Sequence, residues 1–337
     1  MAGQFIVRSL LLATLALSST LADTAKATTT SKTDDYQHQR EQFVQQMVTK
    51  HNFARDQVEE LLTQAQRNEA ILEAIARPWE AKPWFQYYPI FLTEKRLAAG
   101  LKFWHEHQDT LARAEQHYGV PAEIIVAIIG VETFYGGYLG NYLVLDALYT
   151  LGFHYPPRSK FFRSELEQYL LLTQEEKLPA TELKGSYAGA MGYGQFISSS
   201  YRHYAVDFDG DNVRDLLNNP VDAIGSVANY FAKHGWKTNQ PVAVQLGTED
   251  SFEKFVSKGL KPDQSIAELQ QMGLKLPTEL ASDYQAKVFS FELEQGHEYW
   301  LGFTNFYVIT RYNHSPLYAM AVYQFSQQLQ QAKQSQQ

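Results

Sequence analysis

The sequence contains no cysteine, and this absence excludes several kinds of chemistry. Disulfide bonds, a catalytic thiol, thiolate metal ligands and a lipid attached to an N-terminal cysteine all require that residue. Basic residues are also in deficit, because 29 Lys and Arg stand against 37 Asp and Glu, for a formal net charge of −8. That balance does not provide the basic surface typical of nucleic-acid binding. We therefore expect a protein that is stabilised by its core and does not bind nucleic acid.

Long apolar runs are missing as well. The run Leu10–Leu17 follows Arg8 and is too short for an ordinary membrane span, but it has the length of a signal-peptide core. Small residues follow it, as cleavage sites require. The pattern predicts a signal peptide at residues 1–27 and a mature protein that is soluble in the periplasm. An uncleaved anchor or a short apolar helix is the alternative interpretation.

Aromatic residues are abundant, at 14% of the chain. Core packing is the ordinary reason for such a content, and stacking against sugar rings or bases is the more specific one. Most segments have helical periodicity, and residues 97–118 are predicted to form one helix. Alternating apolar and polar residues predict strands over 241–246, 288–294 and 300–309. Ser315 and Pro316 predict the start of a last helix that ends near Gln331. The fold class is therefore α+β and mainly α, with a small β-containing insertion.

One carboxylate, Glu132, lies near the end of an almost wholly apolar helix that begins at Pro121. Ile125, Ile128 and Glu132 share one helix face. If that face is buried, the carboxyl group loses hydration and its pKa rises, so that it can donate a proton near neutral pH. A glutamate that reaches solvent from a helix end is the alternative.

Two polar segments could line a cleft. The run Lys184–Phe196 contains four glycines interleaved with Ser, Tyr and Gln, which suits a backbone that approaches a ligand closely or simply a tight turn. The run Arg311–Ser315 joins a predicted strand to the last helix. His314 within it is more typical of a structural residue than of a catalytic one.

Residues 207–215 (DFDGDNVRD) have the oxygen spacing of a calcium loop. Asn212 stands where glycine is expected, although asparagine tolerates the left-handed conformation, and Asn218 stands where a bidentate glutamate is expected. Asp222 could supply the missing carboxylate. The predicted Ca²⁺ ligands, all hard oxygens, are Asp207, Asp209, Asp211, Val213 through its carbonyl, Asp215 and Asp222. A solvated acidic turn without metal is the alternative.

These segments in this order resemble the B-type lytic murein transglycosylases, continuously over 118–237 and again over 303–325. The resemblance rests on Gly-Val-Glu-Thr at 130–133, the glycine-rich run, the Asp-rich loop and Tyr312-Asn-His-Ser. It implies a lysozyme-like helical core. The predicted parts are a signal peptide (1–27), a linker (28–37), a helical domain (38–117), the catalytic core (118–237 and 306–332) and a small β-containing domain (238–305).

The resemblance also implies a reaction and a set of site residues. The family cleaves the β-1,4 bond between N-acetylmuramic acid and N-acetylglucosamine in peptidoglycan without water, and leaves a 1,6-anhydromuramyl end. One glutamate serves as acid and then as base, and the resemblance gives this role to Glu132. Residues that the resemblance places on the substrate are Ser186, Gln195, Tyr230, Tyr312, Asn313, Tyr318, Arg158 and Tyr87. Pro157 replaces the first of two arginines expected there. The Ca²⁺ is expected to be structural.

Two other functions remain open at this stage. A hydrolytic muramidase of the same fold needs a second carboxylate to position water, and Asp146 is the nearby candidate. A non-catalytic peptidoglycan-binding protein needs no acid at all. The expected partners are peptidoglycan glycan strands and other cell-wall enzymes, and we expect a monomer without a lipid anchor or an organic cofactor.

Overall fold

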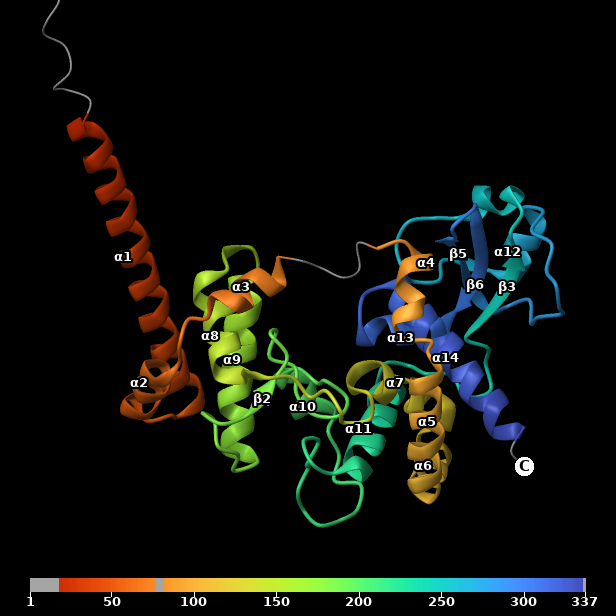
Figure 1. The fold of residues 1–337 in the computed structure, drawn as a ribbon, viewed down its shortest axis with the longest axis horizontal. Helices are drawn as coiled ribbons and strands as arrows, with labels where there is room; N and C mark the ends of the chain where they lie inside the picture. The colour runs from red at the N-terminus through yellow and green to blue at the C-terminus, as the bar shows by residue number, and fades with distance from the viewer. Residues whose placement is uncertain (1–17, 77–81, 336–337) are drawn as a thin grey trace, which may run out of the picture. The chain divides into compact units, whose positions relative to one another are not determined.

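The computed structural model describes residues 18–76 and 82–335, with side chains from residue 35 onward. Contacts divide the chain into two units, residues 1–64 and 65–337. In the first unit, helices α1 (Ser18–His51) and α2 (Arg55–Gln64) contact each other (Figure 1). Val44 and Met47 on α1, and Val58 and Leu62 on α2, are buried. This unit is a helical pair with a small apolar contact.

The predicted signal peptide lies outside the described residues up to residue 17, and only backbone is described from there to residue 34. Helix α1 runs through residues 28–37, for which the small polar composition had predicted a linker. The unit boundary at Gln64 also falls inside the predicted helical domain 38–117. The domain boundaries given above therefore stay predictions.

The second unit is mainly helical, as predicted (Figure 1). Its first part holds α3 (Glu69–Ile75), α4 (Trp84–Tyr87), the 3₁₀ turn η2 (Tyr88–Ile90), α5 (Glu94–Glu106) and α6 (Gln108–Tyr118). Next come α7 (Ala122–Thr133), β1 (Tyr142–Leu143), α8 (Val144–His154), η3 (Pro156–Arg158), α9 (Ser159–Glu175), β2 (Lys184–Gly185), α10 (Ser198–Tyr204) and α11 (Pro220–Lys233). The two short strands β1 and β2 pair antiparallel.

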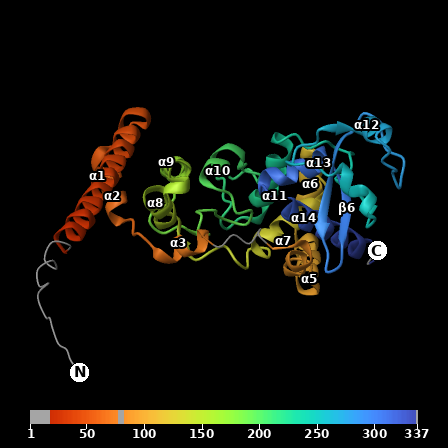
Figure 2. The same cartoon turned by 90° about the horizontal axis from the view of Figure 1, so that it is seen from above.

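Helix α7 is the central element of this unit. Ten of its twelve residues are buried, and the two others are Glu123 and Glu132. The helix contacts α5, α6, α11 and the last helix, α14 (Pro316–Gln334), as Figures 1 and 2 allow the reader to follow. A helix that is apolar on every side must be covered on every side, because water would otherwise meet its isoleucines and valines. Any polar group on such a helix is held inside the protein.

The small β-containing part forms a four-stranded antiparallel sheet. Its order is β3 (Ala243–Gly247), β6 (His297–Phe303), β5 (Gln285–Glu292) and β4 (Gln264–Ser265). The 3₁₀ turn η4 (Asp250–Phe255) and helix α12 (Ile266–Gln271) complete it. Phe255, Ile266, Leu269 and Leu301 are among the buried residues of its own core. The sequence prediction of a β-containing insertion before the last helix is confirmed.

Two predicted elements differ from the structure. The strand predicted over 300–309 ends at Phe303, and residues 304–312 form helix α13 (Thr304–Tyr312). Packing decides this point, since Asn305 at the helix start accepts a hydrogen bond from the Lys237 backbone and donates to the carbonyls of Lys237 and Gln240. The helix predicted over 97–118 is interrupted at His107, whose backbone leaves the helical region.

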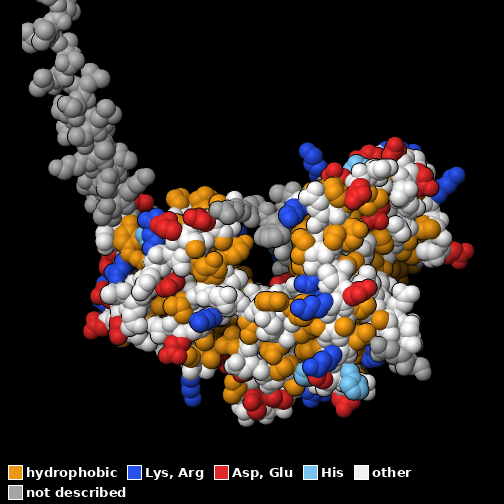
Figure 3. Space-filling model, in the orientation of Figure 1, with side chains coloured by type: hydrophobic (Ala, Val, Ile, Leu, Met, Phe, Trp, Pro, Cys, Tyr) orange, Lys and Arg blue, Asp and Glu red, His pale blue; other side chains and the backbone are white. Residues whose placement is uncertain are grey.

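The predicted start of the last helix is confirmed, because Ser315 caps α14 and Pro316 is its first residue. No helix in the described part of the chain combines the length and the apolar character that crossing a membrane requires. On the face drawn in Figure 3, basic and acidic side chains are interspersed with apolar ones.

Candidate functional site

Glu132 lies one residue before the end of α7, and its side chain is partly buried. The Tyr318 hydroxyl donates a hydrogen bond to its Oε1 at 2.5 Å. Burial raises the pKa of Glu132 to about 7, and the hydrogen bond from Tyr318 opposes that rise. A carboxyl group with this pKa holds a proton for a large fraction of the time at neutral pH. The rise has the cause that the apolar helix predicted, which is burial of the carboxyl group.

Tyr318 is positioned by the start of α14. The Ser315 hydroxyl accepts a hydrogen bond from the Tyr318 backbone N–H at 3.3 Å, which caps the helix and fixes its first turn against α7. The Tyr318 side chain is only 3% exposed. Burial and the nearby Glu132 charge raise the pKa of Tyr318 well above its ordinary value. The tyrosine therefore stays protonated and remains a donor to Glu132 throughout the neutral range.

Tyr312 and Tyr230 tie neighbouring segments to this centre. The Tyr312 hydroxyl donates to the Gly194 carbonyl at 2.6 Å, and the Tyr230 hydroxyl donates to the Arg311 carbonyl at 2.6 Å. Their rings meet edge to face with centroids 4.8 Å apart. Burial and the Glu132 charge raise the pKa of Tyr312 well above its ordinary value. The end of α13, the glycine-rich loop and α11 thus meet beside Glu132.

A pocket of about 250 Å³ gathers four of the predicted site residues, Arg158, Gln195, Tyr230 and Tyr312. The other residues that line it are Phe161, Phe196, Ile197, Ser200, Arg311 and His314. Arg158 lies over the rings of Phe161 and Phe162, at 4.5 and 5.2 Å from their centroids. Arg311 and His314 belong to the Arg311–Ser315 motif but were not among the predicted site residues. Phe161 and Phe196 gave no local signal, because core aromatics have the same spacing.

The glycine-rich run forms a tight loop through its own polar groups. The Ser186 hydroxyl accepts hydrogen bonds from the backbone N–H groups of Ala188 and Ala190. Gln195 has φ of +49° and donates through Nε2 to the carbonyls of Leu139 and Gly192. Gly192 has φ of +70°, and a Cβ there would lie 2.2 Å from the Leu216 carbonyl oxygen. The tight-turn interpretation therefore holds for the backbone, and contact of Ser186 and Gln195 with substrate stays a prediction.

Three other predicted residues have definite places. Tyr87 is 4% exposed, packs on Phe91, and its charge influences the pKa of Tyr318, so it lies near the Glu132 centre. Asn313 ends α13, and its backbone carbonyl accepts from Ser315 N–H at 2.7 Å. Asp146, the candidate second acid, lies in the first turn of α8 and accepts a hydrogen bond from Gln66 N–H at 2.8 Å. Among the described residues, no second carboxylate contributes to the pKa of Glu132.

The Asp-rich loop presents three carboxylates to one point. Oxygens of Asp207, Asp209 and Asp211 all lie within 4.8 Å of one another. Asn212 has φ of +71°, which confirms that asparagine takes the left-handed position of the loop. The donor set consists of hard oxygens and fits Ca²⁺ better than a softer metal.

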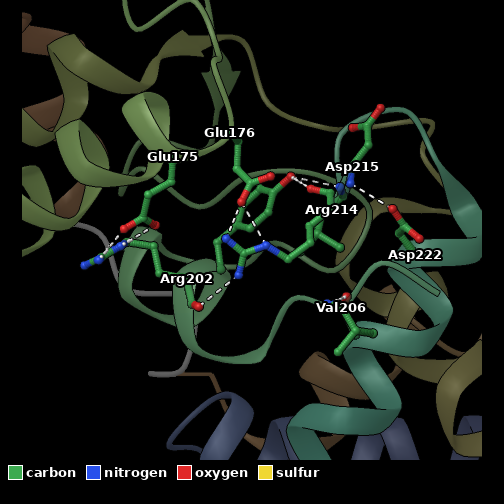
Figure 4. A network of polar contacts seen from close by, with 10 residues as sticks. Glu175, Glu176, Arg202, Val206, Arg214, Asp215 and Asp222 are labelled. Atoms are coloured by element: carbon green, nitrogen blue, oxygen red, sulfur yellow. Dashed lines mark hydrogen bonds and ion pairs between the residues drawn. The ribbon is translucent and has the colours of Figure 1, made fainter. Parts of the chain in front are cut away.

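Asp222 and Asp215 hold the loop closed. Both oxygens of Asp222, which is fully buried, accept backbone hydrogen bonds. One comes from Phe208 N–H at 2.7 Å, and the other comes from Asp215 N–H at 2.8 Å (Figure 4). Asp215 in turn accepts from the backbone N–H groups of Leu217 and Asn218. Arg214 next to them forms an ion pair with Glu176. Ligation of a metal by these two aspartates stays a prediction.

Comparison with known proteins reveals close relatives over nearly the whole chain. The sequence pattern of the "Transglycosylase SLT domain" matches residues 35–327. Membrane-bound lytic murein transglycosylase B of Escherichia coli is 46% identical over 297 residues, which cover 85% of this chain and 81% of that protein.

Solved structures of relatives have the same fold. The catenated lytic transglycosylase SltB1 of Pseudomonas aeruginosa is 49% identical with a TM-score of 0.83, covering 87% of this chain and 97% of that one. The E. coli lytic transglycosylase Slt35, in complex with calcium, is 46% identical with a TM-score of 0.80, covering 87% and 93%. P. aeruginosa SltB3, in complex with NAG-NAM-pentapeptide, is 32% identical with a TM-score of 0.77, covering 88% and 79%. The lysozyme-like fold class predicted from the sequence is confirmed.

The raised pKa of Glu132 has a consequence for stability that can be measured. Because the folded-state pKa lies near 7 and the ordinary value is 4.5, the charged form is penalised in the folded protein above pH 7 and the penalty is absent below pH 4.5. We expect Glu132→Gln to raise the free energy of unfolding by about 2 kcal/mol at pH 8 and by much less at pH 4. Denaturant unfolding at the two pH values measures this difference. The matched control is Glu182→Gln on the surface, and an equal effect of Glu132→Gln at both pH values would contradict the prediction.

Proposed function

The chain belongs to the lytic murein transglycosylase B family, the enzymes that cleave peptidoglycan as lyases, and we propose that Glu132 is its single catalytic acid and base. The observation that carries the proposal is the isolated, partly buried carboxyl group of Glu132 with a hydrogen bond from Tyr318 on one oxygen. That arrangement leaves Oε2 to carry the proton. Among the described residues, no carboxylate influences the pKa of Glu132, and a reaction whose nucleophile is the substrate's own C6 hydroxyl needs only one acid and base.

The first step transfers the Glu132 proton to the glycosidic oxygen between the muramyl C1 and the departing N-acetylglucosamine. The C1–O bond then breaks, and the N-acetyl group of the muramyl residue stabilises the charge that develops at C1. Glu132 is left as a carboxylate. Tyr318 donates to that carboxylate, so the hydrogen bond favours the charged form when it is needed.

In the second step the muramyl C6 hydroxyl attacks C1 and loses its proton to Glu132, which forms the 1,6-anhydro ring and restores the acid. No water molecule is consumed. We propose that Tyr230, Tyr312, Gln195 and Arg158, which line one pocket, hold the sugar on one side of the bond. Ser186, Asn313 and Tyr87 are proposed to contact the substrate nearby. Aromatic rings support this role because they pack against sugar faces and exclude water from C1.

The masses of the products test the reaction. We expect digestion of purified peptidoglycan to release muropeptides with 1,6-anhydromuramyl ends, each lighter by one water than a hydrolytic product. Glu132→Gln is expected to reduce release by about a thousandfold or more, because the amide cannot deliver a proton, while glycan binding persists. Tyr318→Phe serves as a milder companion variant.

Reducing ends alone would instead support a hydrolytic muramidase. Undiminished cleavage by Glu132→Gln would remove this residue from the mechanism, and binding without any cleavage by the wild type would support a non-catalytic wall protein.

We propose that the Asp-rich loop binds Ca²⁺ through Asp207, Asp209, Asp211 and the Val213 carbonyl, and that the ion has a structural role. The clustered oxygens support this, and a relative with 46% identity was crystallised with calcium. Asp215 and Asp222 are proposed as further ligands. The ion would supply loop closure rather than chemistry, since the proton transfers above use only Glu132.

Removal of the metal tests this site. A ligand that binds only the folded state stabilises it, so we expect EDTA to lower the melting temperature and Ca²⁺ to restore it, by a shift on the order of 5 °C. Asp209→Asn should abolish the Ca²⁺-dependent part of the shift, whereas Asp250→Asn, an exposed carboxylate outside the loop, should leave it intact. A metal-stripped protein that melts at the same temperature with and without Ca²⁺ would favour the solvated acidic turn.

We also propose that the chain is exported to the periplasm and is soluble there. The support is the sequence of Arg8, the apolar run 10–17 and the small residues that follow. Fractionation of cells that express the full chain should find a shortened protein in the osmotic-shock fraction. Recovery in the membrane pellet would contradict this proposal and would resemble the E. coli relative, membrane-bound lytic murein transglycosylase B.

A further inference from the structure

Arg96 is a partly buried arginine in the first turn of α5, and nothing in the reaction above uses it. The hydrogen-bond partners of its guanidinium among the described residues are all backbone carbonyls, and no carboxylate pairs with it there. Its guanidinium lies over the rings of Phe91 and Phe134, at 5.3 and 5.4 Å from their centroids. Burial lowers its pKa. A cation held inside a protein without an anion calls for an explanation.

The three carbonyls belong to two separate segments. Nη1 donates to Ile90 at 2.7 Å and to Phe91 at 2.6 Å, at the end of the aromatic segment that contains Tyr87. Nε donates to Gly130 at 3.1 Å, in the last turn of α7 and two residues before Glu132. A cation at this place also complements the negative end of the α7 dipole. One side chain therefore joins the Tyr87 segment to the helix end that carries Glu132.

The helix end that Arg96 contacts is under backbone strain. Phe134 and Tyr135, directly after α7, have φ of +51° and +60°, values that side chains with a Cβ rarely adopt. The Tyr135 hydroxyl fits against Gly100 and Gly130, where a Cβ would lie 2.4 and 2.3 Å from it, and it has no hydrogen-bond partner among the described residues. Such a turn persists only where the surrounding structure holds it.

Other contacts hold the far side of the same turn. The Thr133 hydroxyl donates to the Tyr193 carbonyl at 2.9 Å and accepts from Gly136 N–H at 3.0 Å, which attaches the turn to the glycine-rich loop. Arg96 supplies a second attachment, through Gly130 and the ring of Phe134.

We propose that Arg96 is a positioning residue for the reaction, which acts by clamping the end of α7 to the Tyr87 segment and thereby holds Glu132 against Tyr318. This inference rests on the proposed role of Glu132. Arg96 does not touch the reacting atoms. This role depends on the planar guanidinium group, in which two nitrogen atoms in fixed geometry reach three carbonyls in two segments. A lysine ammonium group cannot reproduce that geometry.

Steady-state kinetics of Arg96→Lys and Arg96→Met test the clamp, with melting temperatures measured in parallel. We expect kcat to fall at least about tenfold in both variants while KM stays within about twofold, because a small displacement of the acid slows the chemistry more than it weakens glycan binding. The matched control is Arg163→Met. Arg163 also donates to a carbonyl, that of Gly152 at 2.6 Å, and lies 5.8 Å from the Phe153 ring centroid, away from Glu132.

A carboxyl NMR titration of Glu132 gives a readout that does not depend on turnover. Arg96→Lys keeps the positive charge, so a change in the pKa of Glu132 reports its hydration and its contact with Tyr318 and Tyr312, the titratable groups that face it. We expect the pKa to fall by about one unit toward the ordinary value, as water reaches the carboxyl group.

A merely structural arginine would give a different result. The inference is overturned if a folded Arg96→Met or Arg96→Lys variant keeps the wild-type kcat and an unchanged Glu132 titration. It is also overturned if Arg96→Met and Arg163→Met lower the melting temperature equally and reduce kcat by the same factor. If Arg96→Met does not fold, Arg96→Lys decides. The proposed function is tested by a different result, because it is contradicted if the wild-type protein releases no anhydromuramyl products.

Discussion

The removal of one carboxyl group from water is the constraint on which the rest of the site depends. Glu132 sits on a helix that is otherwise almost entirely apolar, and burial raises its pKa to about 7. Without that burial a glutamate would be ionised at neutral pH and could not act as an acid. The cost is a charged form that the folded protein does not favour, so the burial that suits Glu132 to its proposed role as an acid also lowers the stability of the protein at high pH.

The residues around Glu132 form hydrogen bonds that stabilise and position its buried carboxyl group. Tyr318 offers a hydrogen bond from a hydroxyl that stays protonated, and Ser315 fixes the start of the helix that carries it. Tyr312 attaches the neighbouring helix to the glycine-rich loop. The Asp-rich loop and the small sheet lie on other segments of the chain. Asp222 attaches the Asp-rich loop to α11, and β6 of the sheet contacts α13.

Sequence patterns predicted the features that depend on interactions between residues close together in the chain. The apolar helix with Glu132, the Ser315 and Pro316 start of α14, and the left-handed Asn212 in the Asp-rich loop all follow from residues close together in the chain. The strand predicted through Ile309 was wrong, because β-branched and aromatic residues suit a buried helix as well as a strand. Asn305 anchors that helix to a carbonyl pair some 65 residues away in sequence, which no local pattern could contain.

Taken alone, the amino-acid sequence determined the family and the mainly helical fold class, and it predicted Glu132 as the acid, since these depend on composition, periodicity and motif order. Only the tertiary structure decided what surrounds that acid. Tyr318 lies 186 positions from Glu132 and Arg96 lies 34 positions from Gly130, so their contacts exist only after α5, α7 and α14 have packed together. The pKa of a carboxyl group depends on its burial and its hydrogen bonds. Both are set by packing, so the size of the pKa shift of Glu132 follows from the tertiary structure and not from the sequence pattern.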